Sequence, residues 1–323
     1  MNQENLFYQL TPDFVMDAVE NAFARTTGEY LQLNSYENRV YSVRLEDREA
    51  TQVIVKFYRP QRWSETAIRE EHAFLDELQG QGVSAIAPLQ QKNGSTLSLH
   101  QGLWCAIFPK ARGRMPQEFF ADDLTSLGRV LARLHNVGSA RPSRERPILD
   151  VEHYLMPALE IVEPMVTPML QERYLHAAHA IIDFLDDELD PSTFQRIHGD
   201  CHRGNVLQTD EPGKPKEYFL IDFDDFGMGP IVQDLWMLFR HDEDDFDEEL
   251  DAFLGGYTEL RDFDESQLRF MEPLRGMRII HYAAWIARRW SDPSFPQIFP
   301  QYGSDAYWLD EVQALEKVVA QLE

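Results

Sequence analysis

His198–Leu207 (HGDCHRGNVL) and Tyr218–Phe223 (YFLIDF) are the two stretches that decide the fold of this 323-residue chain. The segment between them is rich in proline, glycine and charged residues, which predicts a turn. The apolar runs on either side of it, Asn205–Gln208 and Tyr218–Phe223, predict two short strands. If these strands pair antiparallel, the start of the first lies beside the end of the second. Asn205 and Asp222 should therefore meet at one end of a hairpin.

The spacing of three polar side chains suggests a chemistry for this hairpin. Asn205 follows Asp200 by five positions, and Asp222 lies at the end of the next apolar run. Protein kinases carry a catalytic-loop aspartate, an asparagine on the same loop and a later aspartate in this order. Amide and carboxylate oxygens also suit Mg²⁺, which completes its shell with phosphate and water. The pattern predicts phosphoryl transfer from ATP, with Asp200 as the base that orients a hydroxyl, Asn205 and Asp222 as Mg²⁺ ligands, and Asp222 essential to catalysis.

Two other chemistries can be read in the same loop. His198 and His202 are four residues apart, with Cys201 between them, which is a possible start of a zinc site. Gly199 and Gly204 argue against a helix that would align the two histidines, and no CxxC or HExxH spacing supplies further ligands. Cys201 as a nucleophile lacks an accompanying oxyanion-hole signature. We expect His198 to form a local hydrogen bond that holds the loop.

Composition narrows the class of protein. The chain is 43% hydrophobic and 26% charged, which is ordinary for a globular protein, and its length favours two lobes. A net charge of −25 argues against nucleic acid or an anionic membrane as a partner. Two cysteines imply no disulfide framework, and no stretch reads as a signal peptide or a membrane span. We expect a cytoplasmic monomer. The acidic run 242–249 predicts a solvated loop or helix face, with a docking site for a basic substrate as the alternative.

The predicted elements describe an α+β fold with two lobes. The first lobe, residues 1–109, carries a predicted helix at 12–23 and predicted strands at 31–33, 39–45, 52–58 and 103–108. The connector at 109–114 is the place where a kinase-like fold binds adenine through its backbone. The second lobe, residues 110–323, is predicted to be largely helical, with helices that begin at 229–230 and span 266–290. We expect Asp234, in the first of these helices, to brace the metal loop.

Lys56 is the candidate for holding the phosphates of ATP. It ends an apolar strand, as does the lysine that contacts ATP phosphates in kinases. The helix predicted at 65–79 follows it and carries Glu70 and Glu71. Glu71 lies three residues after Ile68 and four before Leu75, so it projects from the inward face. We therefore predict that Glu71 pairs with Lys56, with Glu70 as the alternative.

The tip of the first hairpin departs from most nucleotide-binding loops. No G-x-G-x-x-G lies between the first two strands, and no Walker A sequence occurs in the chain. The tip is instead 34–39 (NSYENR). Asparagine and serine suit a turn, and they can offer N–H groups and a hydroxyl to phosphates. Ser35 is accordingly a candidate ATP contact, and a plain polar turn is the alternative.

Taken together, these motifs resemble a known family. His198–Asn205, Ile221–Phe223 and Asp234-Leu235 resemble the aminoglycoside phosphotransferase and choline kinase branch of the protein-kinase-like fold. Residues 34–41, 55–60 and 285–300 are similar to a bacterial family of stress response kinases within that branch. The resemblance covers about Leu33 to Trp308. Asp222 is followed by Phe223-Asp224 rather than Phe-Gly, which is normal for this branch.

The resemblance implies a function. It implies a cytoplasmic Ser/Thr protein kinase that controls stress-induced cell death, with Asp200 as proton acceptor, Asn205 and Asp222 on Mg²⁺, and Ser35 on ATP. The partners implied are ATP and proteins carrying an acceptor Ser or Thr. Two alternatives stay open. One is a kinase for a small hydroxylated metabolite or a cationic antibiotic; the other is a nucleotide-binding pseudokinase, against which the complete set of motif residues argues.

Overall fold

The computed structural model describes residues 3–46, 51–210, 213, 215–239 and 246–322. Contacts divide the chain into two compact units. Unit 1 comprises Met1–Gln117 and Gly204–Asp224, and unit 2 comprises Glu118–Arg203 and Asp225–Glu323. The first segment of unit 1 runs past the boundary expected at residue 109, and the hairpin at 204–224, expected in the second lobe, belongs to unit 1.

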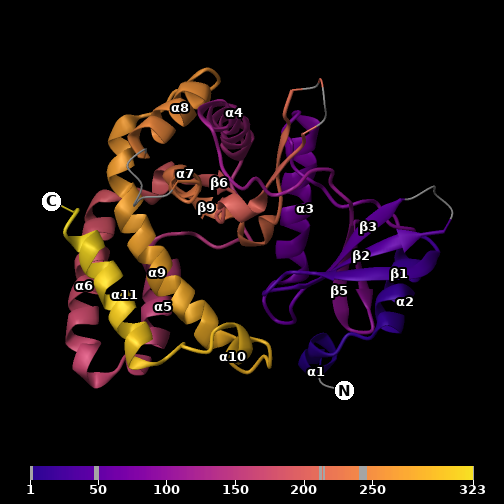
Figure 1. Cartoon of the computed structure of the whole chain (residues 1–323), viewed down its shortest axis with the longest axis horizontal. Helices are drawn as coiled ribbons and strands as arrows, with labels where there is room; N and C mark the ends of the chain where they lie inside the picture. The colour runs from indigo at the N-terminus through magenta and orange to yellow at the C-terminus, as the bar shows by residue number, and fades with distance from the viewer. Residues whose placement is uncertain (1–2, 47–50, 211–212, 214, 240–245, 323) are drawn as a thin grey trace. The chain divides into compact units, whose positions relative to one another are not determined.

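Unit 1 is built on an antiparallel five-stranded sheet with the order β1-β2-β3-β5-β4 (Figure 1). The strands are β1 (Thr26–Leu33), β2 (Arg39–Leu45), β3 (Gln52–Phe57), β4 (Leu97–His100) and β5 (Leu103–Pro109). The helices are α1 (Gln3–Tyr8), α2 (Pro12–Ala22) and α3 (Glu65–Gly80). The predicted helices and the strands β2, β3 and β5 are confirmed to within a residue. The predicted strand at 31–33 is the end of the longer β1, and β4 was not predicted.

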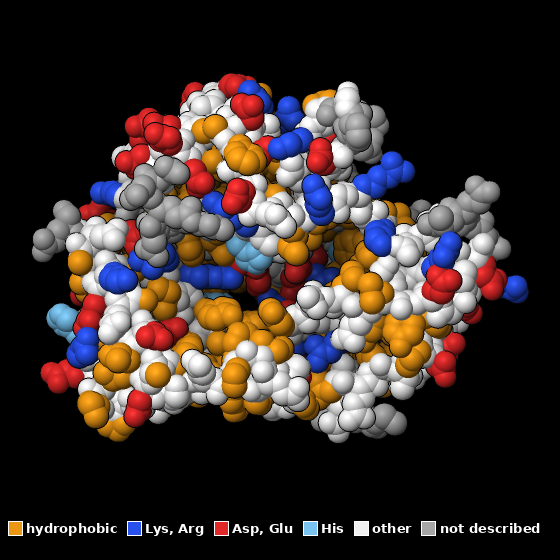
Figure 2. Space-filling view, viewed as in Figure 1, with side chains coloured by type: hydrophobic (Ala, Val, Ile, Leu, Met, Phe, Trp, Pro, Cys, Tyr) orange, Lys and Arg blue, Asp and Glu red, His pale blue; other side chains and the backbone are white. Residues whose placement is uncertain are grey.

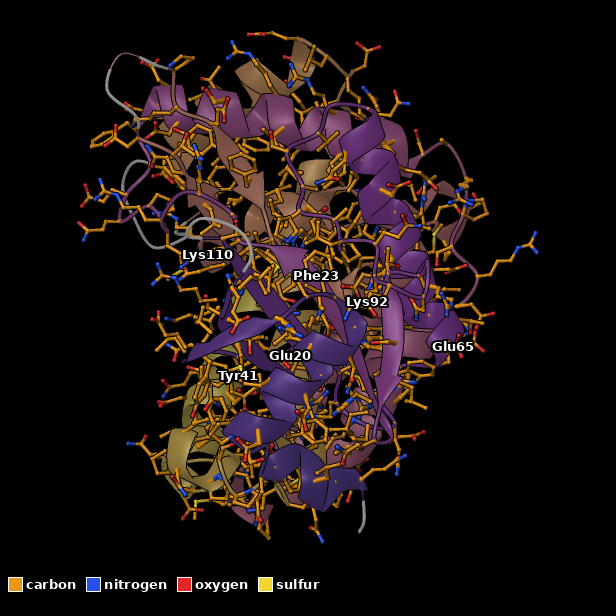
Figure 3. The ribbon with its side chains drawn as sticks, turned by 90° about the vertical axis from the view of Figure 1, so that its right-hand side faces the viewer. Glu20, Phe23, Tyr41, Glu65, Lys92 and Lys110 are labelled. Atoms are coloured by element: carbon orange, nitrogen blue, oxygen red, sulfur yellow. The ribbon has the colours of Figure 1, made fainter. Side chains whose placement is uncertain are left out.

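Alternation along β3 separates the two faces of this sheet. Val53, Val55 and Phe57 are buried in one core with the apolar face of α2, whose outer face is turned toward the viewer in Figure 3. Lys56 points to the opposite face because successive side chains of a strand alternate. Its register partner on β5, Ala106, packs there with Ile68 of α3. The sequence of β3 thus directs Lys56 toward the helix that carries Glu71.

The hairpin predicted from the motif is present in unit 1, with shorter strands than expected. It consists of β7 (Val206–Gln208) and β8 (Tyr218–Leu220), paired antiparallel. Asn205 ends a 3₁₀ turn instead of starting β7, and its carbonyl accepts a hydrogen bond from Ile221 N at 3.0 Å. The second strand does not reach Phe223, because Asp222 adopts a left-handed backbone (φ 59°) and a 3₁₀ turn follows. Asn205 and Asp222 nevertheless lie at the same end of the hairpin.

Unit 2 is mainly helical (Figure 1). Its helices are α4 (Ala121–Gly138), α5 (Met156–Val162), α6 (Pro168–Glu188), α7 (Val232–Trp236), α8 (Phe246–Thr258), α9 (Met271–Arg288), α10 (Phe295–Ile298) and α11 (Asp305–Val319). A π-helical turn spans Val151–Leu155, and β6 (Gln195–Ile197) pairs with β9 (Gly227–Gly229). The helix expected from 229–230 begins only at Val232, because Gly229 still belongs to β9 and a turn at Ile231 precedes the helix.

The helix predicted at 266–290 and the acidic run 242–249 both belong to unit 2. The helix predicted at 266–290 is two elements, a 3₁₀ segment at Glu265–Phe270 and then α9. Of the acidic run, 246–249 begin α8 as a helix face, and acidic side chains gather over α8 in Figure 2. Residues 242–245 lie outside the described residues.

Two findings concern the wider chain. Cys105 and Cys201 are free and buried. Within the described part of the chain, no helix combines the length and the apolar character needed to cross a bilayer.

Candidate active site

A cavity of about 330 Å³ in unit 1 brings most of the predicted residues together. Its lining includes Ser35 from the β1–β2 tip, Lys56 from β3, Glu71 from α3 and Asp222 from the end of the hairpin. The connector residues Pro109, Lys110 and Ala111 line the same cavity, where adenine binding was expected. Apolar lining comes from β1, β2, β3, α3 and β7 (Leu33, Val40, Ile54, Leu75, Leu207). An apolar cavity with a few polar groups at one end is the usual form of a nucleotide site.

Lys56 is held by three carboxylates. Its Nζ lies 2.8 Å from Asp224 Oδ1, 3.3 Å from Glu71 Oε1 and 3.6 Å from Asp222 Oδ1. Burial by itself would lower the pKa of Lys56, but Asp224 and then Glu71 outweigh it and raise the pKa well above its usual value. The ammonium therefore stays charged at neutral pH. The pairing with Glu71 is the one predicted in preference to Glu70.

Asp224 is a residue that the sequence analysis did not select. Its side chain is almost fully buried, and its second oxygen, Oδ2, lies 2.8 Å from Arg62 Nη1. The same Arg62 atom lies 2.9 Å from Glu37 in the β1–β2 tip. Asp224 therefore connects Lys56, through Arg62, to the loop that carries Ser35. The signal in the sequence was the aspartate itself, which lies two positions after Asp222 in the place of a kinase glycine.

Side chains hold the β1–β2 tip in place of a glycine-rich loop. Arg59 Nε lies 3.1 Å from Glu37 Oε1, and Arg59 donates to the main-chain oxygens of Tyr36 and Glu37. Asn38 Oδ1 accepts from Arg59 N at 3.1 Å, and Ser35 Oγ accepts from Asn38 N at 3.3 Å. These bonds fix the conformation of the turn at 34–39. Ser35 is thus part of an ordered tip that lines the cavity.

Asn205 and Asp222 are the predicted ligands for a divalent cation. Among the described residues, no cluster of three or more His, Cys, Asp and Glu side chains could hold a metal without other ligands. Mg²⁺ usually takes only one or two carboxylates and completes its shell with phosphate and water. The Asp222 side chain is 50% exposed and lies at the same hairpin end as Asn205. This donor set fits Mg²⁺ bound together with a nucleotide.

The predicted base, Asp200, belongs to unit 2 rather than to the unit that contains the cavity. Its carboxylate is 16% exposed, with Oδ1 2.5 Å from Arg278 Nη2 on α9 and Oδ2 3.5 Å from His202 Nε2. Arg278 lies far from the motif in the sequence and was not selected there. The main-chain N–H of Asp200 donates to His198 Nδ1 at 3.3 Å, which confirms the expected local role of His198.

Asp234 braces the loop of Asp200. Its two carboxylate oxygens accept from the main-chain N–H groups of His198 at 2.7 Å and Gly199 at 2.8 Å. This agrees with the expectation that Asp234 braces the metal loop, because His198 and Gly199 begin the loop that carries Asn205. Gly199 has φ 81°, and a Cβ on it would lie 2.3 Å from the carbonyl oxygen of Asp225. Only glycine fits that turn.

The alternative chemistries of this loop lack support. Burial, with smaller contributions from Asp234 and Asp200, raises the pKa of the Cys201 thiol well above its usual value. A buried thiol that stays protonated is neither a good nucleophile nor a good metal ligand. His202 is 44% exposed and His198 is fully buried. The two histidines therefore lie in different environments.

The comparisons with known proteins agree with this geometry. The model of the phosphotransferase enzyme family, APH, matches residues 29–271. The chain belongs to this family. It is also 39% identical to stress response kinase A of Salmonella choleraesuis over 94% of the chain and 90% of that protein. For stress response kinase A of Escherichia coli K12 the identity is 38%, with 95% and 92% covered.

Solved structures show the same fold at low identity. An amicoumacin kinase, solved in complex with AMP-PNP and Ca²⁺, is similar with a TM-score of 0.78 and 17% identity, over 99% of this chain and 96% of that one. A microcompartment-associated aminopropanol kinase is similar with a TM-score of 0.73 and 18% identity, over 96% of each chain. The chain therefore has the α+β, bilobal, protein-kinase-like fold expected from its sequence. It is an ATP-dependent phosphotransferase related to the stress response kinases.

Proposed function

We propose that this phosphotransferase is a Mg²⁺-dependent protein kinase that transfers the γ-phosphoryl group of ATP to Ser or Thr hydroxyls. The observation that carries the proposal is the complete set of Lys56, Asp200, Asn205 and Asp222, in the order and environments that kinase chemistry needs. The protein acceptor rests on a relative, 39% identical over 94% of this chain, that is named serine/threonine protein kinase RdoA in Salmonella typhimurium.

Each residue has a defined task in this proposal. Lys56 binds the phosphates of ATP, and Glu71 and Asp224 hold its ammonium in place. Ser35 and the ordered β1–β2 tip bind the phosphates from the other side, with the connector 109–111 at adenine. Asn205 and Asp222 would hold Mg²⁺, which when bound neutralises charge on the phosphates. Asp200 orients the acceptor hydroxyl and accepts its proton.

The biological role is part of the same proposal. The relatives named stress response kinase A support a function in bacterial stress, and we propose that this function is control of stress-induced cell death. A cytoplasmic location is proposed with it, because cellular ATP would be the phosphoryl donor. The partners are then cytoplasmic proteins with accessible Ser or Thr, and no partner is proposed among nucleic acids or membranes.

One experiment tests the acceptor class. The purified chain and its Asp200→Asn variant are incubated with γ-labelled ATP, Mg²⁺ and a bacterial lysate, and label in proteins and in small molecules is measured. Mass spectrometry should find new phosphoserine and phosphothreonine with the wild type alone. The variant should keep ATP affinity and lose roughly 10²–10⁴-fold in rate, the usual contribution of a positioned base.

The other outcomes separate the remaining hypotheses. Label that enters a small molecule while phosphoserine and phosphothreonine do not rise would show a metabolite or antibiotic kinase, as the printed names of the solved structures describe for those proteins. ATP binding without transfer to either fraction would show a pseudokinase. Full activity of Asp200→Asn would move the base elsewhere, with His202 the next residue to test.

A further inference from the structure

The carboxylate of Asp200 is held by a side chain from α9. Arg278 Nη2 contacts Asp200 Oδ1 across a sequence separation of 78 residues. The side chains of Arg278 and Asp200 are 20% and 16% exposed, so water screens the pair only partly. A charge-assisted contact of this kind is both strong and directional. Asp200 is therefore fixed through its side chain by α9, as well as through its loop by Asp234.

The backbone that carries Arg278 is rigid. Met277 and Ile280, on either side of it, are buried in the core of unit 2. Gly276 lies two residues before Arg278. It lets α9 approach α6 so closely that a Cβ there would lie 2.7 Å from Ile181 Cδ1. A helix packed in this way cannot shift without disturbing its neighbours. The main-chain position from which the Arg278 side chain extends is therefore fixed.

Other side chains restrict the guanidinium itself. Tyr154 accepts a hydrogen bond from Arg278 and stacks on His281, with ring centroids 3.8 Å apart and planes 13° apart. Burial alone would lower the pKa of Arg278, but Asp200, Tyr154 and Asp225 raise it, so the group remains a cation. The carboxylate of Asp225 favours the same charge. Arg278 is therefore a fixed, charged anchor.

We propose that Arg278 is a positioning residue for catalysis, which acts through Asp200. This inference rests on the proposed function. The guanidinium binds Oδ1 and so fixes the rotation of the carboxylate. The other oxygen, Oδ2, which lies 3.5 Å from His202 Nε2, would then orient the acceptor hydroxyl. Phosphoryl transfer depends mainly on positioning, so an anchor that fixes the direction of the carboxylate suits this chemistry. Loss of the anchor should lower kcat and leave the binding of ATP unchanged.

A double-mutant cycle tests this directly. Arg278→Gln, Arg278→Lys, Asp200→Asn and the double variant Arg278→Gln/Asp200→Asn are compared with the wild type in kcat, in KM for ATP and in ATP affinity. The reaction measured is ATP turnover with Mg²⁺, in which Asp200 orients water or a protein hydroxyl. We expect Arg278→Gln to lower kcat roughly 10–100-fold with KM for ATP unchanged, since a misplaced catalytic group costs about that much. Arg278→Lys should recover part of the rate.

The double variant gives the decisive reading. If Arg278 acts through Asp200, Arg278→Gln has no further effect once Asp200 is Asn. Arg275 supplies the matched control, because it lies one turn earlier on α9 and pairs with Glu272 at 2.5 Å rather than with Asp200. Arg275→Gln should keep the wild-type kcat, which shows that loss of an arginine from α9 is not itself the cause.

Each remaining result has a defined meaning. Equal losses from Arg278→Gln in the wild type and in Asp200→Asn would overturn the inference, because the arginine would then act independently of the base. A wild-type or raised kcat in Arg278→Gln would overturn it as well. If Asp200→Asn itself keeps full activity, the proposed role of Asp200 fails instead. Should Arg278→Gln not fold, the partial rate of Arg278→Lys and its coupling to Asp200→Asn decide the question.

Discussion

Lys56→Met should cost stability as well as activity. The substitution keeps most of the apolar stem of Lys56 and removes the ammonium. That ammonium lies 2.8 Å from Asp224 and 3.3 Å from Glu71, and all three side chains are at most 8% exposed. Removing one partner of a buried ion pair costs about 3–5 kcal/mol, because the remaining charge stays buried. Asp224 keeps Arg62 at 2.8 Å, so the expected loss lies near the lower end, about 3 kcal/mol. The half-exposed Asp222 is left out of this figure because water screens it.

The assay must report on unit 1, since a chain of two units need not unfold in one step. Hydrogen exchange of the β3 and α3 amides, measured by mass spectrometry, gives the local free energy of opening. Glu71→Gln added to Lys56→Met should restore part of the loss, because it removes a buried charge that has lost its partner. The pKa of Lys56 is raised, so its contribution is complete below about pH 10.4 and disappears only above that. The loss should therefore be constant between pH 6 and 9.

Lys92→Met is the matched control. Lys92 is an exposed lysine of unit 1 that donates to the main-chain oxygen of Glu20, and Figure 3 shows the two residues near each other at the outer face of α2. Its substitution should change the opening free energy by no more than about 0.5 kcal/mol. If Lys56→Met is equally mild, the charges around Lys56 are solvated in solution and the reasoning from burial is refuted.

Three other expectations can be checked separately. Asp222→Ala should abolish the Mg²⁺ dependence of nucleotide affinity, measured by calorimetry. Asn205→Ala should reduce that dependence less, because only Asp222 is charged. Equal affinity with and without Mg²⁺ in the wild type would count against this assignment. Gly256→Ala should destabilise unit 2 by about 1–3 kcal/mol or more, because its Cβ would lie 1.9 Å from a main-chain oxygen of α4. The neighbouring Gly255→Ala should stabilise unit 2 by about 0.5–1 kcal/mol, because its Cβ would meet open space. Thermal melts that rank the two variants the other way would contradict this packing. Burial raises the pKa of Glu311 from 4.5 to about 7, so its contribution to stability is complete below pH 4.5 and is lost as pH rises through about 7. Glu311→Gln should remove this pH dependence from the urea unfolding midpoints. A pH profile that is the same in the variant and the wild type would show that the carboxyl is solvated.

Local features of the sequence were enough to predict the elements that carry the site. Alternating apolar residues over 52–58 predict β3, and strand geometry then requires Lys56 to face away from Val55 and Phe57. The placement of Glu71 between Ile68 and Leu75 similarly predicts its inward direction, and the contact with Lys56 is present. These inferences hold because each depends on the periodicity of a single element.

The boundaries of elements were less predictable where tertiary contacts end them. The strand expected to continue to Phe223 stops at Leu220, and Asp222 takes a left-handed backbone that nothing in its neighbours announces. The helix expected over 266–290 begins only at Met271. The apolar sequence pattern continues past the end of β8 and precedes the start of α9, because the side chains stay buried while the backbone hydrogen bonds change. The pattern therefore does not show where the strand ends or where the helix begins.

The sequence by itself determined the family, the α+β fold and the order of the motif residues, because these are carried by short segments with strong periodicity and fixed spacing. Only the tertiary structure decided which distant charges meet. Asp224 with Arg62, Asp234 with the main chain of Gly199, and Arg278 with Asp200 join residues 35 to 162 positions apart. No local rule relates such positions, since their contact depends on how whole helices and strands pack, and on the requirement that each buried charge find a partner.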